Sequence, residues 1–187
     1  MNGLIEALKT ITGRLEQLNI PYMVFGGIAN SIYGNPRQTF DVDIKFSVET
    51  EDEMDRFLVE VESVAVMLPE DSRQFMEETN VLPVEIGSVR IDLVKADLPF
   101  EKEAISRSRI VDFLGARIRV CTAEDLIIQK AVSSREKDWL DIKAVIENQR
   151  DKMDWPYILK HCKDLSDLLD KREIYDKIRV WKDEECL

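Results

Sequence analysis

The sequence predicts an α/β protein, with a short mixed β-sheet flanked by helices and a helical segment at the C-terminus. Two features of the apolar pattern support this prediction. Up to residue 120, stretches with apolar residues at helical spacing alternate with short stretches in which every second residue is apolar. From residue 121 onward, the helical spacing continues to the end. We therefore expect an α/β core at residues 1–120 and a helical segment at residues 121–187 that packs on it.

The composition indicates a soluble intracellular protein. The chain of 187 residues is 44% hydrophobic, which is enough to bury a core. Its formal net charge is −11, so its surface as a whole should repel nucleic acid. Cys121, Cys162 and Cys186 show no metal-ligand spacing, and no secretory signal or membrane-spanning run is present. We expect a cytoplasmic protein with reduced thiols and no membrane partner.

The first elements are expected to be a helix, a strand and a second helix. Residues 4–18 carry apolar side chains at helical spacing, and residues 20–25 are a continuous apolar run typical of a buried strand. Gly26 and Gly27 end that strand, and residues 28–33 form a short helix.

A turn at residues 34–39 and an alternating strand at residues 40–46 follow. The stretch 47–80 holds 11 acidic and 2 basic residues and contains helices near residues 51–64 and 73–78. After it, the alternation returns in two hairpins, and the rest is helical. The hairpins are expected at residues 81–96 and 108–120, and the helices at residues 122–132, 136–149, 154–162 and 165–181.

Two aspartates share one face of the strand at residues 40–46. Residues two apart on a strand point to the same side, so Asp41 and Asp43 face one way while Val42 and Ile44 face the core. Two carboxylates held this close repel each other unless a cation lies between them. A hard divalent ion such as Mg²⁺ fits, because it takes carboxylate and phosphate oxygens as ligands.

The glycine pair supplies a matching feature. A strand that ends in Gly26 and Gly27 before a short helix allows a phosphate to approach backbone N–H groups at the positive end of that helix. Alone, the glycines also fit a tight turn, and Asp41 and Asp43 also fit a solvated edge strand. Asp92 lies between apolar neighbours in a later strand, and a buried aspartate is rarely left unpaired. It therefore favours a binding site over a tight turn and a solvated edge strand.

Together these residues resemble the DNA polymerase β-like nucleotidyltransferase superfamily. Its pattern is an apolar strand, a Gly-Gly pair, a short helix, an Asp-x-Asp strand ("DVDI" here) and a third carboxylate on a neighbouring strand, which Asp92 in "VRIDLV" matches. The segment "CTAEDLIIQKAVSSREKDWLDIKAVI" looks like a region of the branch that includes AbiEii- and MenT-type toxins and small bacterial nucleotidyltransferases. The resemblance implies a nucleotidyltransferase fold.

The resemblance also implies a two-metal reaction. Two Mg²⁺ ions are held by Asp41, Asp43 and Asp92, and an acceptor hydroxyl attacks the α-phosphorus of a nucleoside triphosphate (NTP), with release of pyrophosphate. Asp92 would lie on the acceptor side and could take the proton. Gly26 and Gly27 would contact the phosphates, with Ser31 as a further donor.

Lys130 lies on the apolar face of the helix that Thr122 and Asp125 begin. A lysine there either extends its ammonium to solvent or meets a buried anion, and with the family match we favour a contact with a substrate phosphate. Asp138 and Asp141, one helical turn apart, fit either solvated acids or the site, and Asp138 is the better site candidate.

Two further residues have an open or a structural interpretation. Arg37, in the turn before the acids, fits the triphosphate or an ion pair with Asp41 equally well. The single histidine, His161, is expected on a helix surface, which leaves little basis for a histidine-base mechanism.

The acceptor is not defined by the sequence. A tRNA, a protein hydroxyl and a small molecule remain open, and the acidic stretch 47–80 suits a polycationic antibiotic better than tRNA. The toxin-type resemblance adds the hypothesis of a toxin with an antitoxin partner. The alternative is a non-catalytic nucleotidyltransferase-fold protein that acts as a binding or antitoxin-like partner.

Overall fold

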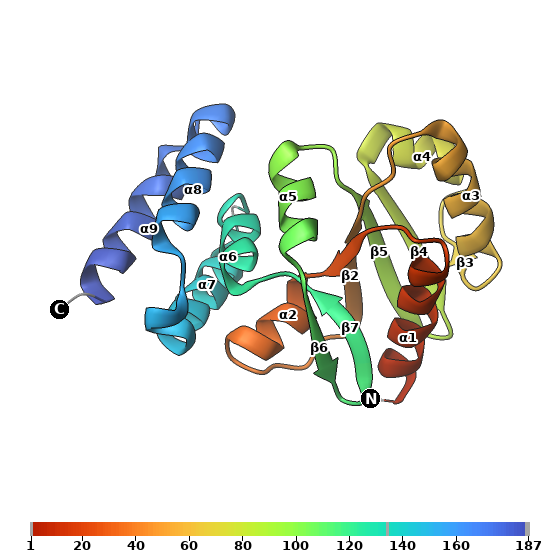
Figure 1. Ribbon diagram of the computed structural model, residues 1–187, viewed down its shortest axis with the longest axis horizontal. Coiled ribbons are helices and arrows are strands. Elements are labelled where there is room, and N and C mark those ends of the chain that lie inside the picture. The colour runs from red at the N-terminus through yellow and green to blue at the C-terminus, as the bar shows by residue number, and fades with distance from the viewer. Residues whose placement is uncertain (1, 134, 186–187) are drawn as a thin grey trace. The chain divides into compact units, whose positions relative to one another are not determined.

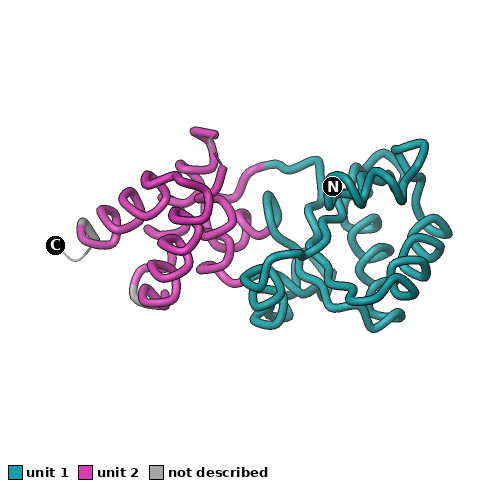
Figure 2. The backbone as a smooth tube through the Cα atoms, turned by 90° about the horizontal axis from the view of Figure 1, so that it is seen from above, with its two compact units in different colours: residues 1–28, 38–121 teal, residues 29–37, 122–187 magenta. Residues whose placement is uncertain are grey.

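The computed structural model describes residues 2–133 and 135–185, which group into two compact units (Figure 2). Unit 1 comprises residues 1–28 and 38–121, and unit 2 comprises residues 29–37 and 122–187. The boundary falls inside helix α2 (Gly26–Tyr33), so residues 29–37 group with the C-terminal helices. None of the described helices is long and apolar enough to cross a membrane.

Within the described part of unit 1, seven strands form one mixed sheet in the order β3-β4-β5-β2-β1-β7-β6 (Figure 1). β1 runs antiparallel to β2 and parallel to β7, and β2 runs parallel to β5. The outer pairs β3–β4, β4–β5 and β6–β7 are antiparallel. The strands are β1 (Tyr22–Val24), β2 (Asp41–Phe46), β3 (Val66–Met67), β4 (Val81–Ile86), β5 (Val89–Lys95), β6 (Arg109–Phe113) and β7 (Ala116–Val120).

Helices of unit 1 bury apolar stripes against this sheet. α1 (Asn2–Gln17) packs on β2, β5 and β7 through Leu8, Ile11 and Leu15, which are fully buried. α3 (Glu51–Glu62) begins with a capping box at Thr50 and stacks Phe57 on Phe46 of β2. α4 (Ser72–Thr79) and α5 (Pro99–Arg107) are the other described helices of this unit.

Unit 2 is helical. It contains α6 (Ala123–Ala131), α7 (Glu136–Gln149), the short 3-10 helix η1 (Arg150–Lys152), α8 (Trp155–Leu169) and α9 (Arg172–Glu185). α6 packs against α7 and α8, and α8 packs against α9. Asp170 ends α8 in the left-handed conformation with φ of 51°.

The predicted α/β class and mixed sheet are confirmed, and the structure differs from the sequence prediction in four local features. Gly26 and Gly27 begin α2 instead of lying before it. Helix α8 continues to Leu169, beyond the predicted end at residue 162, and the predicted helix 165–181 is divided at Asp170, where the backbone is left-handed. β3 spans only two residues, too few to show a period, whereas α5 does carry a start signal in Pro99 and Glu101 that the sequence prediction missed.

Candidate functional site

The start of α2 is built around two close approaches that require glycine. Gly26 has φ of +61°, and a Cβ on it would lie 1.8 Å from Oδ2 of Asp43. A Cβ on Gly27 would lie 2.5 Å from Oγ1 of Thr39. The glycine pair therefore does more than turn the chain, because it admits the Asp43 carboxylate beside the positive end of a helix.

Three aspartates of unit 1 occupy one face of neighbouring strands. In the parallel pairing of β2 and β5, Asp43 is the register partner of Asp92, and Asp41 is the partner of Arg90. Register partners on adjacent strands point to the same face, which agrees with the alternation in the sequence. The opposite face carries fully buried apolar neighbours: Val42, Ile44, Ile91 and Leu93.

The immediate partners of these carboxylates differ. Arg90 Nε donates to Oδ1 of Asp92 at 2.9 Å, and the Thr39 hydroxyl donates to Oδ1 of Asp41 at 2.7 Å. Asp41 is exposed, whereas Asp43 and Asp92 are half-buried. Carboxylate oxygens in this number suit a hard divalent cation. Across residues 2–133 and 135–185, however, no three His, Cys, Asp or Glu side chains are placed as a formed metal site.

A second ionic cluster lies within unit 2. Lys130 Nζ donates to Asp138 Oδ1 at 2.7 Å and to Asp141 Oδ2 at 2.8 Å, and all three residues are at most 8% exposed. Arg135 Nε donates to Oδ2 of Asp138 at 2.6 Å. Burial opposes ionisation of Asp138, but its hydrogen bonds with Lys130, Ser133 and Arg135 outweigh burial and lower its pKa.

Residues 29–37 join this cluster. Asn30 Nδ2 donates to Oδ1 of Asp141 at 3.3 Å, and Arg37 forms an ion pair with Oδ2 of Asp141 at 3.4 Å. Asn148 and Gln149 of α7 donate to backbone carbonyls of Gly34 and Tyr33, which fixes the segment further. Asn30 is fully buried and was not predicted as a functional residue, although a polar residue inside an apolar helix signals a specific partner.

The structure decides several of the open interpretations. Asp138 and Asp141 are buried, so the solvated-acid alternative is wrong. The anions that Lys130 meets within unit 2 are their carboxylates, and the side chain of Arg37 pairs with Asp141. The Ser31 hydroxyl donates to the carbonyl of Arg37 at 3.3 Å.

His161 does not lie on the helix surface, and the prediction that it does is wrong. It is 6% exposed, with its ring 4.3 Å from that of Tyr157. Cys121 and Cys162 are buried and form no disulfide, and burial raises the pKa of Cys162 to about 12. Cys186 lies outside the described residues.

The mixed sheet carries Asp-x-Asp and a third aspartate on adjacent strands next to a Gly-Gly helix start, which is the pattern expected from the sequence for a nucleotidyltransferase. Residues 1–185 match the family described as "Nucleotidyltransferase of unknown function (DUF6036)", and the chain belongs to that family. No curated protein matches the sequence.

Solved structures show the same fold at low sequence identity. The antibiotic-resistance factor ANT(2'')-Ia is 16% identical, with a TM-score of 0.59 over 93% of this chain and 97% of its own. An antigenic nucleotidyltransferase-like protein from Paracoccidioides brasiliensis is 17% identical, with a TM-score of 0.56 over 94% and 93% of the two chains. The lincosamide antibiotic adenylyltransferase LnuA, bound to lincomycin, is 14% identical, with a TM-score of 0.52 over 75% and 94%.

Proposed function

We propose that the protein is a Mg²⁺-dependent nucleotidyltransferase that moves NMP from an NTP to a hydroxyl acceptor. The observation that carries this proposal is the Asp43 carboxylate, which lies against Gly26 at the start of α2 and in register with Asp92 on β5. This arrangement supports the proposal because a helix start that could bind phosphate lies next to carboxylates that could bind metal ions within unit 1. Family membership supports the reaction class.

In the proposed reaction, the acceptor oxygen attacks the α-phosphorus of the NTP. A new bond forms between that oxygen and phosphorus, the bond to the bridging oxygen of the β-phosphate breaks, and pyrophosphate leaves. Asp41, Asp43 and Asp92 would hold two Mg²⁺ ions, which lower the pKa of the acceptor hydroxyl and offset the charge of the triphosphate. Asp92 takes the hydroxyl proton, and Gly26 and Gly27 orient the phosphates through the backbone.

Residues outside this set have proposed supporting roles. NTP contacts of Lys130, Arg37 and Ser31 stay predictions, because Lys130 and Arg37 are paired with carboxylates within unit 2. Asp138 holds the Lys130 ammonium in place through a 2.7 Å hydrogen bond, so its role would be to position that lysine.

A small-molecule acceptor is the version that the structural relatives support best, since LnuA is named as an adenylyltransferase of lincosamide antibiotics. A tRNA or protein acceptor remains an alternative proposal. The AbiEii- and MenT-type resemblance, with a toxin role and an antitoxin partner, also stays a prediction, and growth arrest on expression would support it. The non-catalytic alternative predicts no NTP binding.

Calorimetric titration of the four NTPs tests the function. We expect at least one NTP to bind in the presence of Mg²⁺, with binding lost in EDTA and in the Asp41→Asn variant. Asp52→Asn is the matched control, because Asp52 is an exposed aspartate of α3. NTP binding that persists in Asp41→Asn would contradict the metal assignment, and absence of binding in the wild type would favour the non-catalytic alternative.

A further inference from the structure

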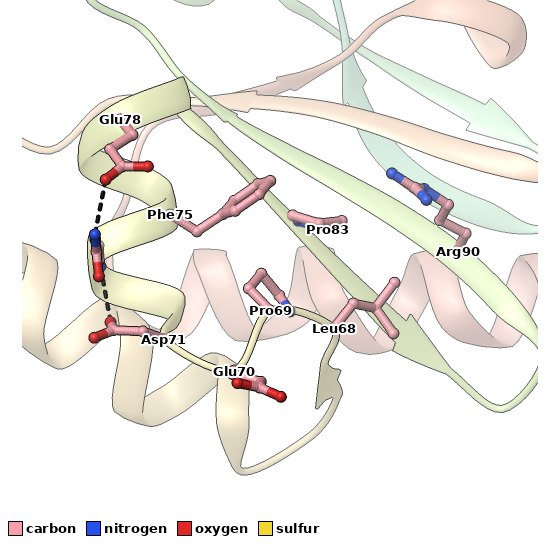
Figure 3. A pocket seen from close by; sticks show the side chains of 9 residues that line it. Leu68, Pro69, Glu70, Asp71, Phe75, Glu78, Pro83 and Arg90 are labelled. Carbon is pink, nitrogen blue, oxygen red and sulfur yellow. Dashed lines mark hydrogen bonds between the residues drawn. The ribbon is translucent and has the colours of Figure 1, made fainter.

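A pocket at one edge of the sheet belongs to no part of the machinery proposed so far. This edge pocket, of about 340 Å³, is formed by residues 68–71, the exposed side of α4, Pro83 of β4 and Arg90 of β5 (Figure 3). All of its lining residues belong to unit 1. Its size is at the lower end of pockets that bind small molecules.

The floor of the edge pocket is apolar. Figure 3 shows the ring of Phe75 lying beside Pro83, with Leu68 and Pro69 next to them. Pro83 is buried, whereas Phe75 and Leu68 remain 37% and 44% exposed. Large apolar side chains gathered in a hollow offer a surface that gains free energy when an apolar group covers it.

The rim of the edge pocket is acidic. Glu70, Asp71 and Glu78 line it, and Glu70 makes no hydrogen bond or ion pair with any described residue. The one basic lining residue, Arg90, is already paired with Asp92. Arg73, which lies in the same helix as Phe75, is held by Glu51, Asp55 and Glu77. The rim therefore favours a cation and repels an anion.

The edge pocket adjoins the proposed metal-binding carboxylates. Pro83 in its floor is the register partner of Asp92, and Arg90 in its wall is the register partner of Asp41. Register partners on adjacent strands share a face and lie roughly 5 Å apart. A molecule in the pocket thus lies one strand away from Asp92, the carboxylate assigned above to the acceptor side.

We propose that the edge pocket binds the acceptor of the nucleotidyl transfer, and that this acceptor is a hydroxyl-bearing small molecule with a protonated amine next to an apolar group. The inference rests on the proposed function and adds the chemical class of its acceptor. The apolar group packs on Phe75, the ammonium lies at the acidic rim, and the hydroxyl points to Asp92.

Three small probes with a phenyl ring and a hydroxyl test this class by charge. Phenylethanolamine is a cation, α-methylbenzyl alcohol is neutral and mandelate is an anion. Binding is followed by two-dimensional amide NMR of the full chain. NTP and metal are left out, so that binding to the edge pocket is measured independently of nucleotidyl transfer. We expect phenylethanolamine to shift the amides of Leu68, Phe75 and Arg90 and to bind at least about tenfold more tightly than mandelate.

Variants test whether the acidic rim of the edge pocket, and not a change in the fold, determines probe binding. Glu70→Gln and Glu78→Gln should each weaken phenylethanolamine binding severalfold, while Glu62→Gln, an exposed glutamate of α3 outside the pocket, should leave it unchanged. Phe75→Leu should weaken binding of all three probes, and an otherwise unchanged spectrum shows that it is folded.

The outcomes distinguish this inference from the proposed function. If NTPs bind with Mg²⁺ but phenylethanolamine shifts no pocket amide, or binds no better than mandelate, the acceptor pocket is overturned and the proposed function stands. If the pocket binds phenylethanolamine but no NTP binds, the proposed function fails and the acceptor role with it.

Discussion

The site aspartates of unit 1 and the buried aspartates of unit 2 are held by different partners. In unit 2, Asp138 pairs with Lys130 and Arg135, and Asp141 pairs with Lys130 and Arg37, so each buried carboxylate meets two cations. In unit 1, Asp41 is held by the neutral hydroxyl of Thr39, and Asp92 is paired with the single cation Arg90. The chain's own cations already offset the charge of Asp138 and Asp141, whereas the carboxylate of Asp41 can still take an external cation.

Removal of the central cation of unit 2 gives the largest expected effect. Lys130→Ala leaves Asp138 and Asp141 buried without the ammonium that both accept from, which should lower the free energy of unfolding by roughly 3–5 kcal/mol. Urea denaturation measures the change. Lys163→Ala is the control, because Lys163 pairs with Asp167 on an exposed helix face and such pairs are worth about 1 kcal/mol or less. Equal losses in the two variants would show that the Lys130 cluster is not a stabilising centre.

Substitution of Gly26 tests how tightly the unit 1 site is built. Gly26→Ala puts a Cβ at the position of the Asp43 carboxylate and also strains the backbone. We expect the free energy of unfolding to fall by more than the roughly 1 kcal/mol that the backbone strain alone would cost. Gly87→Ala isolates the strain, since Gly87 has φ of +63° and no atom within 4 Å of the added Cβ. Thermal unfolding measures the loss of stability in the Gly26→Ala and Gly87→Ala variants. A Gly26 variant no less stable than the Gly87 variant would contradict the close approach of Asp43.

The smallest expected effect is the pH dependence of the unit 2 cluster. Since the folded structure lowers the pKa of Asp138 from 3.8, the stabilisation from its ionised form is present above that value and is lost as the pH falls toward the lowered pKa. Unfolding free energies measured below pH ~5 should therefore decline more steeply in the wild type than in Asp138→Asn. Parallel curves would argue against a lowered pKa.

The parts of the site that depend on local periodicity could be predicted from the sequence. Strand alternation was sufficient to place Asp41 and Asp43 on one face of their strand. Helical spacing was sufficient to place Lys130 on the buried face of its helix. The spacing of His161, three residues after the buried Ile158 and four before the buried Leu165, also indicates that its side chain is buried, contrary to the surface position expected from the sequence.

Partners far apart in the chain were beyond this kind of reasoning. Asn30 and Asp141 are 111 positions apart, and no local sequence periodicity predicts that they form a hydrogen bond. The same holds for the pairing of Arg37 with Asp141, 104 positions away. The ion pair of Arg90 with Asp92 was local, but a strand pattern predicts which face a side chain occupies and not which neighbour it contacts.

Helix α2 has a consequence for how this chain can be cut and recombined. Its first residues belong to unit 1, while Asn30 and the turn that follows α2 belong with the helices that begin at Ala123. A fragment that stops at residue 121 would keep Asn30 and Arg37 but lose Asp141 and α7, so polar groups that are buried would need new partners. The modules of this protein are therefore interleaved, and a gene fusion that exchanges its C-terminal part must exchange residues 29–37 as well.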